Sequence, residues 1–191
     1  MTLFQRLRAR AFALAALFLI LAPVPAQAAV ELTFYAKEMG GAFPHGFVTL
    51  VGTPDRGGAA VDTAYGFTAA SVTPAILFGR VGGRLEITPP DYIGTAESHV
   101  AVTLTDAEYD AVLALVARWQ ALEQPSYSLK RRNCVHFIAE VAGTLGMDAE
   151  VPENLTRRPV GYLQSLIRRN RDWIAARNAR ILREPGEERR G

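Results

Sequence analysis

The sequence predicts an α+β fold in which an antiparallel sheet packs against a helix that bears the single cysteine, followed by an amphipathic C-terminal helix. Three observations predict this fold class. Short segments rich in β-branched and aromatic residues recur between residues 30 and 104, with Gly- and Pro-containing turns between them. From residue 105 onward, apolar residues recur with the period of a helix. The 191 residues are 49% hydrophobic and 21% charged, which is typical of a globular protein and excludes a wholly disordered chain.

The first 28 residues have the three parts of a secretory signal peptide. An arginine-rich start is followed by an apolar run from Ala11 to Ala22 and by the A-x-A cleavage site Ala26-Gln27-Ala28. The apolar run has about 12 residues, whereas a membrane-spanning helix needs roughly 20, which disfavours the alternative of an uncleaved anchor. We therefore expect residues 1–28 to be removed and the protein to be exported, either to the periplasm or out of the cell.

Five strands are expected after the leader, each bounded by residues that favour turns. They are Val30–Glu38, His45–Gly52, Ala59–Phe67, Gly83–Pro90 and Glu97–Leu104. The second is apolar on both faces, which indicates burial, and a turn at residues 53–58 makes it a hairpin with the third. The segment Ala70–Gly79 is apolar but broken by a proline.

Three helices are expected after the strands. Thr105 and Glu108 form a capping box that opens the first, which ends near Leu122. The second begins near Asn133 and ends between residues 143 and 146. The third is a long amphipathic helix from Val160 to about Arg183.

Charge divides the exported chain into two parts, which we expect to be a domain at residues 29–156 and a basic helix and tail at residues 157–191. The first part carries 8 basic and 15 acidic side chains, and the second carries 10 basic and 4 acidic. A basic segment of this kind binds either the acidic domain or an anionic surface such as lipid head groups or wall polymer, so residues 160–183 are a candidate for peripheral membrane contact. The simpler alternative is a solvated helix face. Nucleic acid is not expected as a partner, because the whole chain has a formal charge of only +2.

Cys134 is the candidate nucleophile, because it lies at the start of a predicted helix and follows the basic run Lys130-Arg131-Arg132. A helix N-terminus and nearby cations both stabilise a thiolate and lower the pKa of the thiol. The alternative is a buried structural cysteine, since Cys134 shares a helical stripe with Phe137, Ile138 and Val141. Export favours a functional role, because an unpaired cysteine is exposed to oxidation outside the cytoplasm. His45 opens a buried strand, where a lone imidazole needs a partner, and it is the candidate general base.

The stretches "PHGFVTLVG" around His45 and "YSLKRRNCVHF" around Cys134 resemble the circularly permuted papain-like fold of the NlpC-type peptidase superfamily. This superfamily includes lecithin:retinol acyltransferase-like proteins, with an N-C-E-H-F signature, and PPPDE thiol peptidases, with an N-C-x-x-F stretch. The resemblance covers roughly residues 30–146, and permutation accounts for a histidine that precedes the cysteine. It implies that Cys134 is the nucleophile and His45 the base.

The third catalytic residue departs from the family pattern. Some relatives place a second histidine shortly after the first, but no histidine lies between His45 and His99 in this chain. Asp62 on the neighbouring strand is the candidate to orient His45. A shift of one residue in the hairpin would present Thr63 or Tyr65 instead, and a carboxylate at a strand edge without catalytic role is the alternative.

The other chemical motifs are excluded. His136 lies two residues after Cys134 and is expected to serve in packing or hydrogen bonding, and His99 is expected at the surface or core edge. The histidine and cysteine spacings do not fit a zinc site, and the glycine pairs do not form a phosphate-binding loop, so no metal or cofactor is expected.

Two classes of function follow from the sequence. The first is an exported thiol hydrolase or acyltransferase that acts on amide or ester bonds, with cell-envelope peptides as the natural substrate and lipid acyl groups as the alternative. The second is a non-catalytic binding or scaffold domain of the envelope, on the same fold, with Cys134 in the core. A peripheral membrane protein that functions through its C-terminal helix is a third reading.

Overall fold

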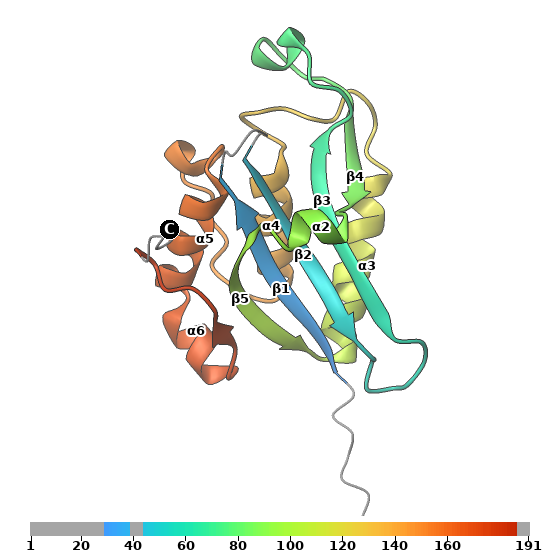
Figure 1. Ribbon diagram of the computed structural model, residues 1–191, viewed down its shortest axis with the longest axis vertical. Helices are drawn as coiled ribbons and strands as arrows, with labels where there is room; N and C mark the ends of the chain where they lie inside the picture. Colours follow the sequence, from blue (N-terminus) through green and yellow to red (C-terminus); the bar gives the residue numbers. More distant parts are fainter. Residues whose placement is uncertain (1–28, 39–43, 187–191) are drawn as a thin grey trace, which may run out of the picture.

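The structure is a computed structural model that describes residues 29–38 and 44–186; the predicted signal peptide lies outside the described residues. Its centre is a six-stranded antiparallel sheet with the order β4-β3-β2-β1-β5-β6 (Figure 1). The strands are β1 (Val30–Lys37), β2 (His45–Gly52), β3 (Val61–Ala69), β4 (Gly83–Ile87), β5 (Glu97–Leu104) and β6 (Arg180–Ile181). The α+β class and the five strands that the sequence predicts are confirmed, and β6 is an additional edge strand.

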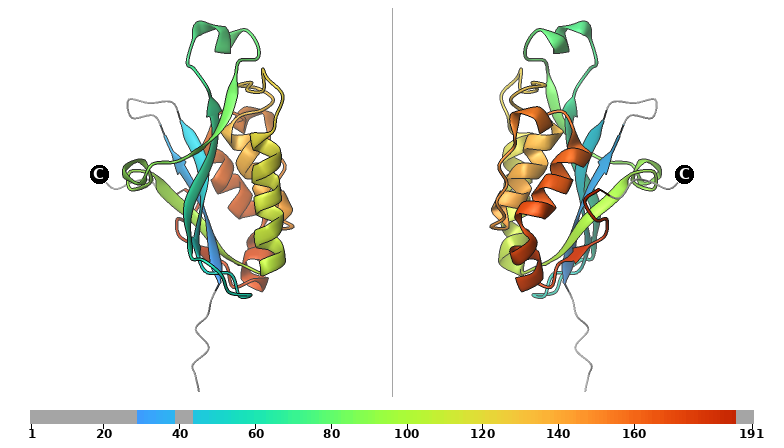
Figure 2. Two further views of the ribbon diagram at one scale, coloured as in Figure 1. Left: turned by 90° about the vertical axis from the view of Figure 1, so that its right-hand side faces the viewer. Right: turned by 90° about the vertical axis from the view of Figure 1, so that its left-hand side faces the viewer.

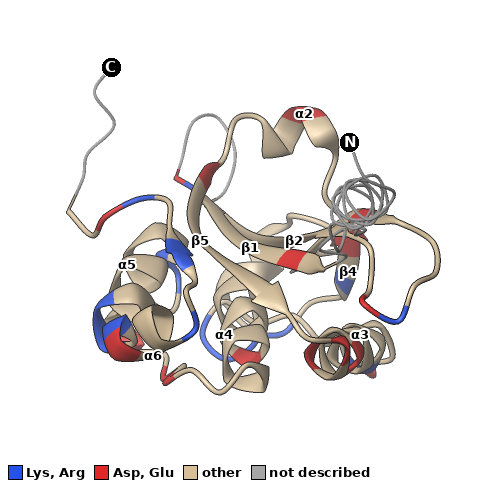
Figure 3. Cartoon of the chain, turned by 90° about the horizontal axis from the view of Figure 1, so that it is seen from below, with Lys and Arg blue, Asp and Glu red and all other residues tan. Residues whose placement is uncertain are grey.

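Helices cover the two faces of the sheet unequally. The three long helices α3 (Asp106–Gln120), α4 (Cys134–Thr144) and α5 (Pro159–Arg169) pack on one face, whereas the single turn α2 (Pro90–Ile93) lies on the other (Figures 2 and 3). The apolar core therefore forms between the sheet and the three long helices. It includes Val48 and Leu50 of β2, Phe137 and Ile138 of α4 and Leu163 of α5, all fully buried.

The capping box at the start of α3 is confirmed. The Glu108 backbone N–H donates to the Thr105 hydroxyl, and the Glu108 carboxylate accepts from the Thr105 backbone N–H at 2.9 Å. Arg177 adds an ion pair to the same carboxylate and, with the cap, lowers the pKa of Glu108 to about 2. The start of α3 is therefore tied to the C-terminal segment.

The predicted long helix at residues 160–183 is wrong in its extent. The segment forms α5, then α6 (Arg171–Ala176), then β6. The break falls at Asn170, whose amide donates to the carbonyls of Leu166 and Asp148 and whose oxygen accepts from the Asp148 N–H at 2.7 Å. A buried asparagine that satisfies backbone groups of two segments ends the helix, which apolar periodicity does not reveal.

The apolar stripe of α5 packs on the sheet. Tyr162, Leu163, Leu166 and Ile167 are fully buried in the core, and β6 pairs with β5. The buried apolar residues of the described C-terminal segment thus belong to the same core as those of residues 29–156. Among the described residues, no helix is long and apolar enough to cross a bilayer.

Candidate functional site

Asn133 sets the position of Cys134 at the start of α4. Its side-chain oxygen accepts from the Val135 N–H at 2.9 Å and caps the helix. Its amide donates to the carbonyls of Leu129 at 2.8 Å and Thr156 at 2.7 Å, so both loops beside the helix start are held in place. Because Asn133 is 2% exposed, its side chain satisfies its hydrogen bonds inside the protein and caps the turn that carries the thiol.

The sheet opens beside Cys134. Pairing between β2 and β3 ends at Phe47 and Gly66, after which β2 continues to His45 beside β1, and β3 continues to Ala69 beside β4. Gly46 lies in this opening, and the absence of a side chain there lets β2 approach the helix. A Cβ atom at Gly46 would lie 2.9 Å from Cδ1 of Ile138. From this position the Gly46 backbone N–H lowers the pKa of the Cys134 thiol.

The pKa of the Cys134 thiol is shifted in the direction opposite to the one expected. The helix N-terminus was expected to lower the pKa of the thiol, but burial raises it to about 11. The backbone N–H groups of Gly46, Val135 and Cys134 itself act in the opposite direction and lower the pKa. With 7% of its surface exposed, Cys134 is therefore a neutral thiol surrounded by three donors that would stabilise negative charge.

His45 lies on the face of the sheet that α2 covers. Its ring stacks on Phe47, at 6.0 Å between ring centroids, and meets the edge of Tyr92 from α2 at 6.1 Å. The ring crosses over Gly66 so closely that a Cβ atom at that position would lie 2.4 Å from Nε2 of His45. Burial lowers the pKa of His45, so the imidazole is neutral at neutral pH.

His45 and Cys134 line the same cavity, which has a volume of about 240 Å³ and lies at the opening between β2 and β3. Tyr92 and Tyr127 also line it, and Cys134 and burial together raise the pKa of each phenol, burial being the larger cause. Two buried polar atoms of the cavity, Nε2 of His45 and Oγ1 of Thr88, have no hydrogen-bond partner within the described residues. Buried polar atoms without a partner are costly, so the cavity is suited to a polar ligand.

The register of β2 and β3 does not bring Asp62 to His45. Asp62 pairs with Val51, six residues further along β2, and its side chain is exposed. At about 3.3 Å per residue, the separation is of the order of 20 Å, so the expected orienting role is wrong for this register. The alternatives Thr63 and Tyr65 pair with Leu50 and Val48, five and three residues beyond His45 along β2.

Glu86, which was not among the residues predicted from the sequence, is the carboxylate whose charge acts on His45. It lies on β4 directly opposite Gly66, over which the His45 ring lies, and it lines the same cavity. Its charge raises the pKa of His45 against the larger effect of burial. Arg84 holds the carboxylate through an ion pair of 3.0 Å. The sequence alone carries no signal for it, because Glu86 lies opposite Gly66 only once β3 and β4 pair in this register.

The other two histidines stand outside the cavity. Nδ1 of His136 lies 3.0 Å from Oδ1 of Asn133, which confirms its expected role in hydrogen bonding. His99 was expected at the surface or core edge, but it is fully buried at the irregularity where β5 pairs with β1, and burial lowers its pKa to about 4. Its two ring nitrogens have no hydrogen-bond partner within the described residues.

Comparisons with known proteins do not assign the chain to a family. Neither a family model, nor a curated protein, nor a solved structure matches the chain. Within the described residues, no group of three His, Cys, Asp or Glu side chains could hold a metal ion.

Proposed function

We propose that this protein is an exported cysteine hydrolase or acyltransferase that cleaves amide or ester bonds, with the circularly permuted papain-like fold. The observation that carries the proposal is the shared cavity of Cys134 and His45, two residues 89 positions apart in the sequence. Within it, backbone N–H groups lower the pKa of the thiol, and the Nε2 atom of a neutral imidazole has no hydrogen-bond partner among the described residues, the thiol included. These are the parts that a thiol nucleophile and a general base require.

The proposed reaction begins when His45 takes the proton of the Cys134 thiol as the sulfur attacks the substrate carbonyl. The new S–C bond gives a tetrahedral oxyanion, and the backbone N–H of Cys134 contributes a hydrogen bond to it. His45 then gives the proton to the leaving amine or alcohol as its bond to carbon breaks. Water in a hydrolase, or another nucleophile in an acyltransferase, attacks the resulting thioester, and the thiol is regenerated.

Because both Cys134 and His45 are neutral before the substrate reacts, the thiol proton moves to His45 only as the sulfur attacks the carbonyl. Burial disfavours both the thiolate and the imidazolium, because it raises the pKa of Cys134 to about 11 and lowers that of His45. The charged pair therefore forms only as the sulfur attacks, when the three backbone donors and Glu86 are in place to stabilise it. Peptides of the cell envelope are the proposed substrates, and lipid acyl groups are the alternative.

One observation favours a second candidate function, a non-catalytic envelope-binding domain. Cys134 belongs to the buried apolar cluster together with Val135, Phe137 and Ile138, so the thiol also has the surroundings of a structural residue. In this case the cavity would bind a polar ligand without reacting with it.

An activated ester separates the two candidates without knowledge of the natural substrate. The protein is incubated with 4-nitrophenyl acetate, and intact-mass and peptide mass spectrometry locate any acetyl group. We expect a thioester on Cys134 with release of nitrophenol, and loss of both in Cys134→Ala and His45→Ala. Asp62→Asn is the matched control, because its carboxylate lies at the far end of β2. Nitrophenol release that Cys134→Ala leaves unchanged would overturn the proposal.

A further inference from the structure

The segment between β3 and β4 carries an unusual amount of exposed apolar surface. It extends beyond the end of β2 at the top of Figure 1, and residues Pro74–Leu77 form a 3-10 turn at its tip. Phe78 is 87% exposed, Leu77 69% and Val72 61%, whereas Ile76 is buried and anchors the turn. Side chains this large and this exposed, gathered at one projecting tip, indicate an interaction surface.

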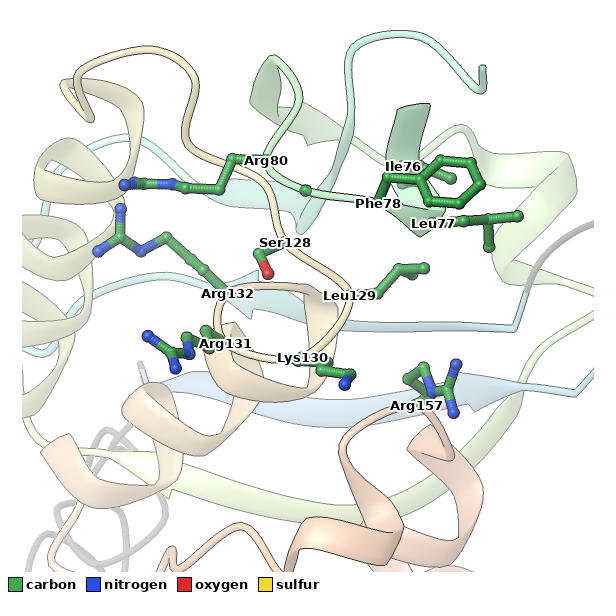
Figure 4. Close-up of a pocket in the computed structure, with 11 residues that line it drawn as sticks. Ile76, Leu77, Phe78, Arg80, Ser128, Leu129, Lys130, Arg131, Arg132 and Arg157 are labelled. Atoms are coloured by element: carbon green, nitrogen blue, oxygen red, sulfur yellow. The ribbon is translucent and has the colours of Figure 1, made fainter. Parts of the chain in front are cut away.

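A cationic cavity of about 570 Å³ adjoins this tip (Figure 4). Its lining has no acidic side chain, and its basic residues are Arg80, Lys130, Arg131, Arg132 and Arg157. Within residues 29–38 and 44–186, none of the five forms an ion pair, although eight other basic side chains do. The fold therefore leaves five cations uncompensated around one cavity while it pairs cations elsewhere, which points to an anionic ligand.

The cations and the apolar tip form one continuous surface. Figure 4 shows Ile76, Leu77 and Phe78 on one side of the cavity and the side chains of Arg80, Arg131 and Arg132 on the other. A surface that inserts apolar side chains while its cations contact phosphates fits the boundary between head groups and acyl chains of an anionic bilayer. A soluble anionic peptide would use the cations but would leave Phe78, at the tip, in water.

We propose that residues 71–82 and the adjacent cations form a docking surface for an anionic lipid membrane, which we call the docking tip. This places membrane contact on the β3–β4 segment and not on residues 160–183, whose apolar side chains are in the core. Ile76 and Leu129 line both the cationic cavity and the cavity of Cys134. The docking tip therefore adjoins the Cys134 cavity. The proposal does not depend on catalysis.

The charge contribution is tested with vesicles of neutral phosphatidylcholine alone and with 30% anionic phosphatidylglycerol. The measured quantity is the ratio of the two binding constants, obtained by sedimentation of the full chain. Each cation near an anionic surface contributes about fivefold, so Arg131→Gln/Arg132→Gln should lower the ratio by about 25-fold at most and at least fivefold. Arg168→Gln/Arg171→Gln removes the same charge from the C-terminal segment and should change the ratio less than twofold. Residues 1–28 are common to all variants and cannot produce a difference between them.

The insertion of the tip is tested separately with a fluorescent side chain. Phe78→Trp should show a blue shift on addition of anionic vesicles and quenching by brominated acyl chains. Val51→Trp, at an exposed apolar position on the sheet, should show neither change. Three results would overturn the proposal: equal ratios in the two arginine variants, an unquenched Trp at position 78, or binding of soluble polyglutamate in place of anionic vesicles. A Cys134→Ala protein should bind vesicles as the parent does, so docking and catalysis can fail independently.

Discussion

Replacing Gly66 by alanine should displace the His45 ring and reduce thiol reactivity, although neither proposed catalytic residue is itself substituted. The added Cβ atom would lie 2.4 Å from Nε2 of His45, whereas ordinary contacts begin at 3.4 Å. The ring must therefore move by about 1 Å, and a misplacement of this size in a catalytic group costs on the order of 100-fold in rate. Phe47, whose Cβ atom would lie at 3.2 Å, needs to shift by only a few tenths of an ångström.

The assay is acylation of Cys134 by 4-nitrophenyl acetate, followed by intact-mass spectrometry. Gly143→Ala is the matched control, because Gly143 lies in α4 with Cys134 and its added Cβ atom would meet only Ala149 at an ordinary 3.7 Å. We expect the control to keep the parental acylation rate. A folded Gly66→Ala protein that also keeps the parental rate would refute the placement of His45 at the reacting thiol.

Thermal unfolding distinguishes a displaced ring from a damaged strand. If the clash with His45 dominates, the free energy of unfolding lost through Gly66→Ala should be partly recovered when His45→Ala is combined with it, because the smaller side chain vacates the space. Additive losses in the double variant would assign the effect to β3 itself.

Two further predictions concern charge. Glu86→Gln should lower the pKa of His45 and move the acidic limb of the pH–rate profile to lower pH, because the carboxylate favours the imidazolium; Asp62→Asn should leave the profile in place. The second prediction concerns His99, whose pKa is about 4 in the folded protein and 6.5 in the unfolded chain. Because the unfolded chain binds a proton more readily, the free energy of unfolding falls as pH drops from 6.5 toward 4. The loss approaches about 3 kcal/mol, and Glu97 and Arg183 are the charged neighbours of the His99 ring. Chemical unfolding at several pH values should show that His99→Gln removes this part of the pH dependence. The same dependence of unfolding free energy on pH in His99→Gln would contradict the prediction.

The sequence predicts local features well where the signal is local. The capping box at Thr105, the helix start at Asn133 and the strand that His45 opens are confirmed because caps, turns and alternation act over a few residues. The register of the β2–β3 hairpin could not be predicted, because the glycines at its turn allow several lengths, and this error led to Asp62.

Tertiary contacts decided the remaining differences. Asn170 ends α5 because its side chain binds the loop at Asp148, 22 residues earlier. The pKa of Cys134 rises because the sheet buries the thiol, and this burial outweighs the helix N-terminus and the neighbouring cations that the sequence shows. Glu86 acts on His45 through its charge from the position on β4 opposite Gly66, and this placement requires three strands to be in register.

Whether His45 acts on the Cys134 thiol is measured by the rate at which iodoacetamide alkylates the folded protein as a function of pH. A thiol with a pKa of about 11 is almost wholly protonated at neutral pH, so its reaction there depends on a base beside it. We expect His45→Ala to slow alkylation at least tenfold near pH 7.5, while both proteins react alike once denatured. Coincident curves for the two folded proteins, or no labelling of either before denaturation, would contradict it.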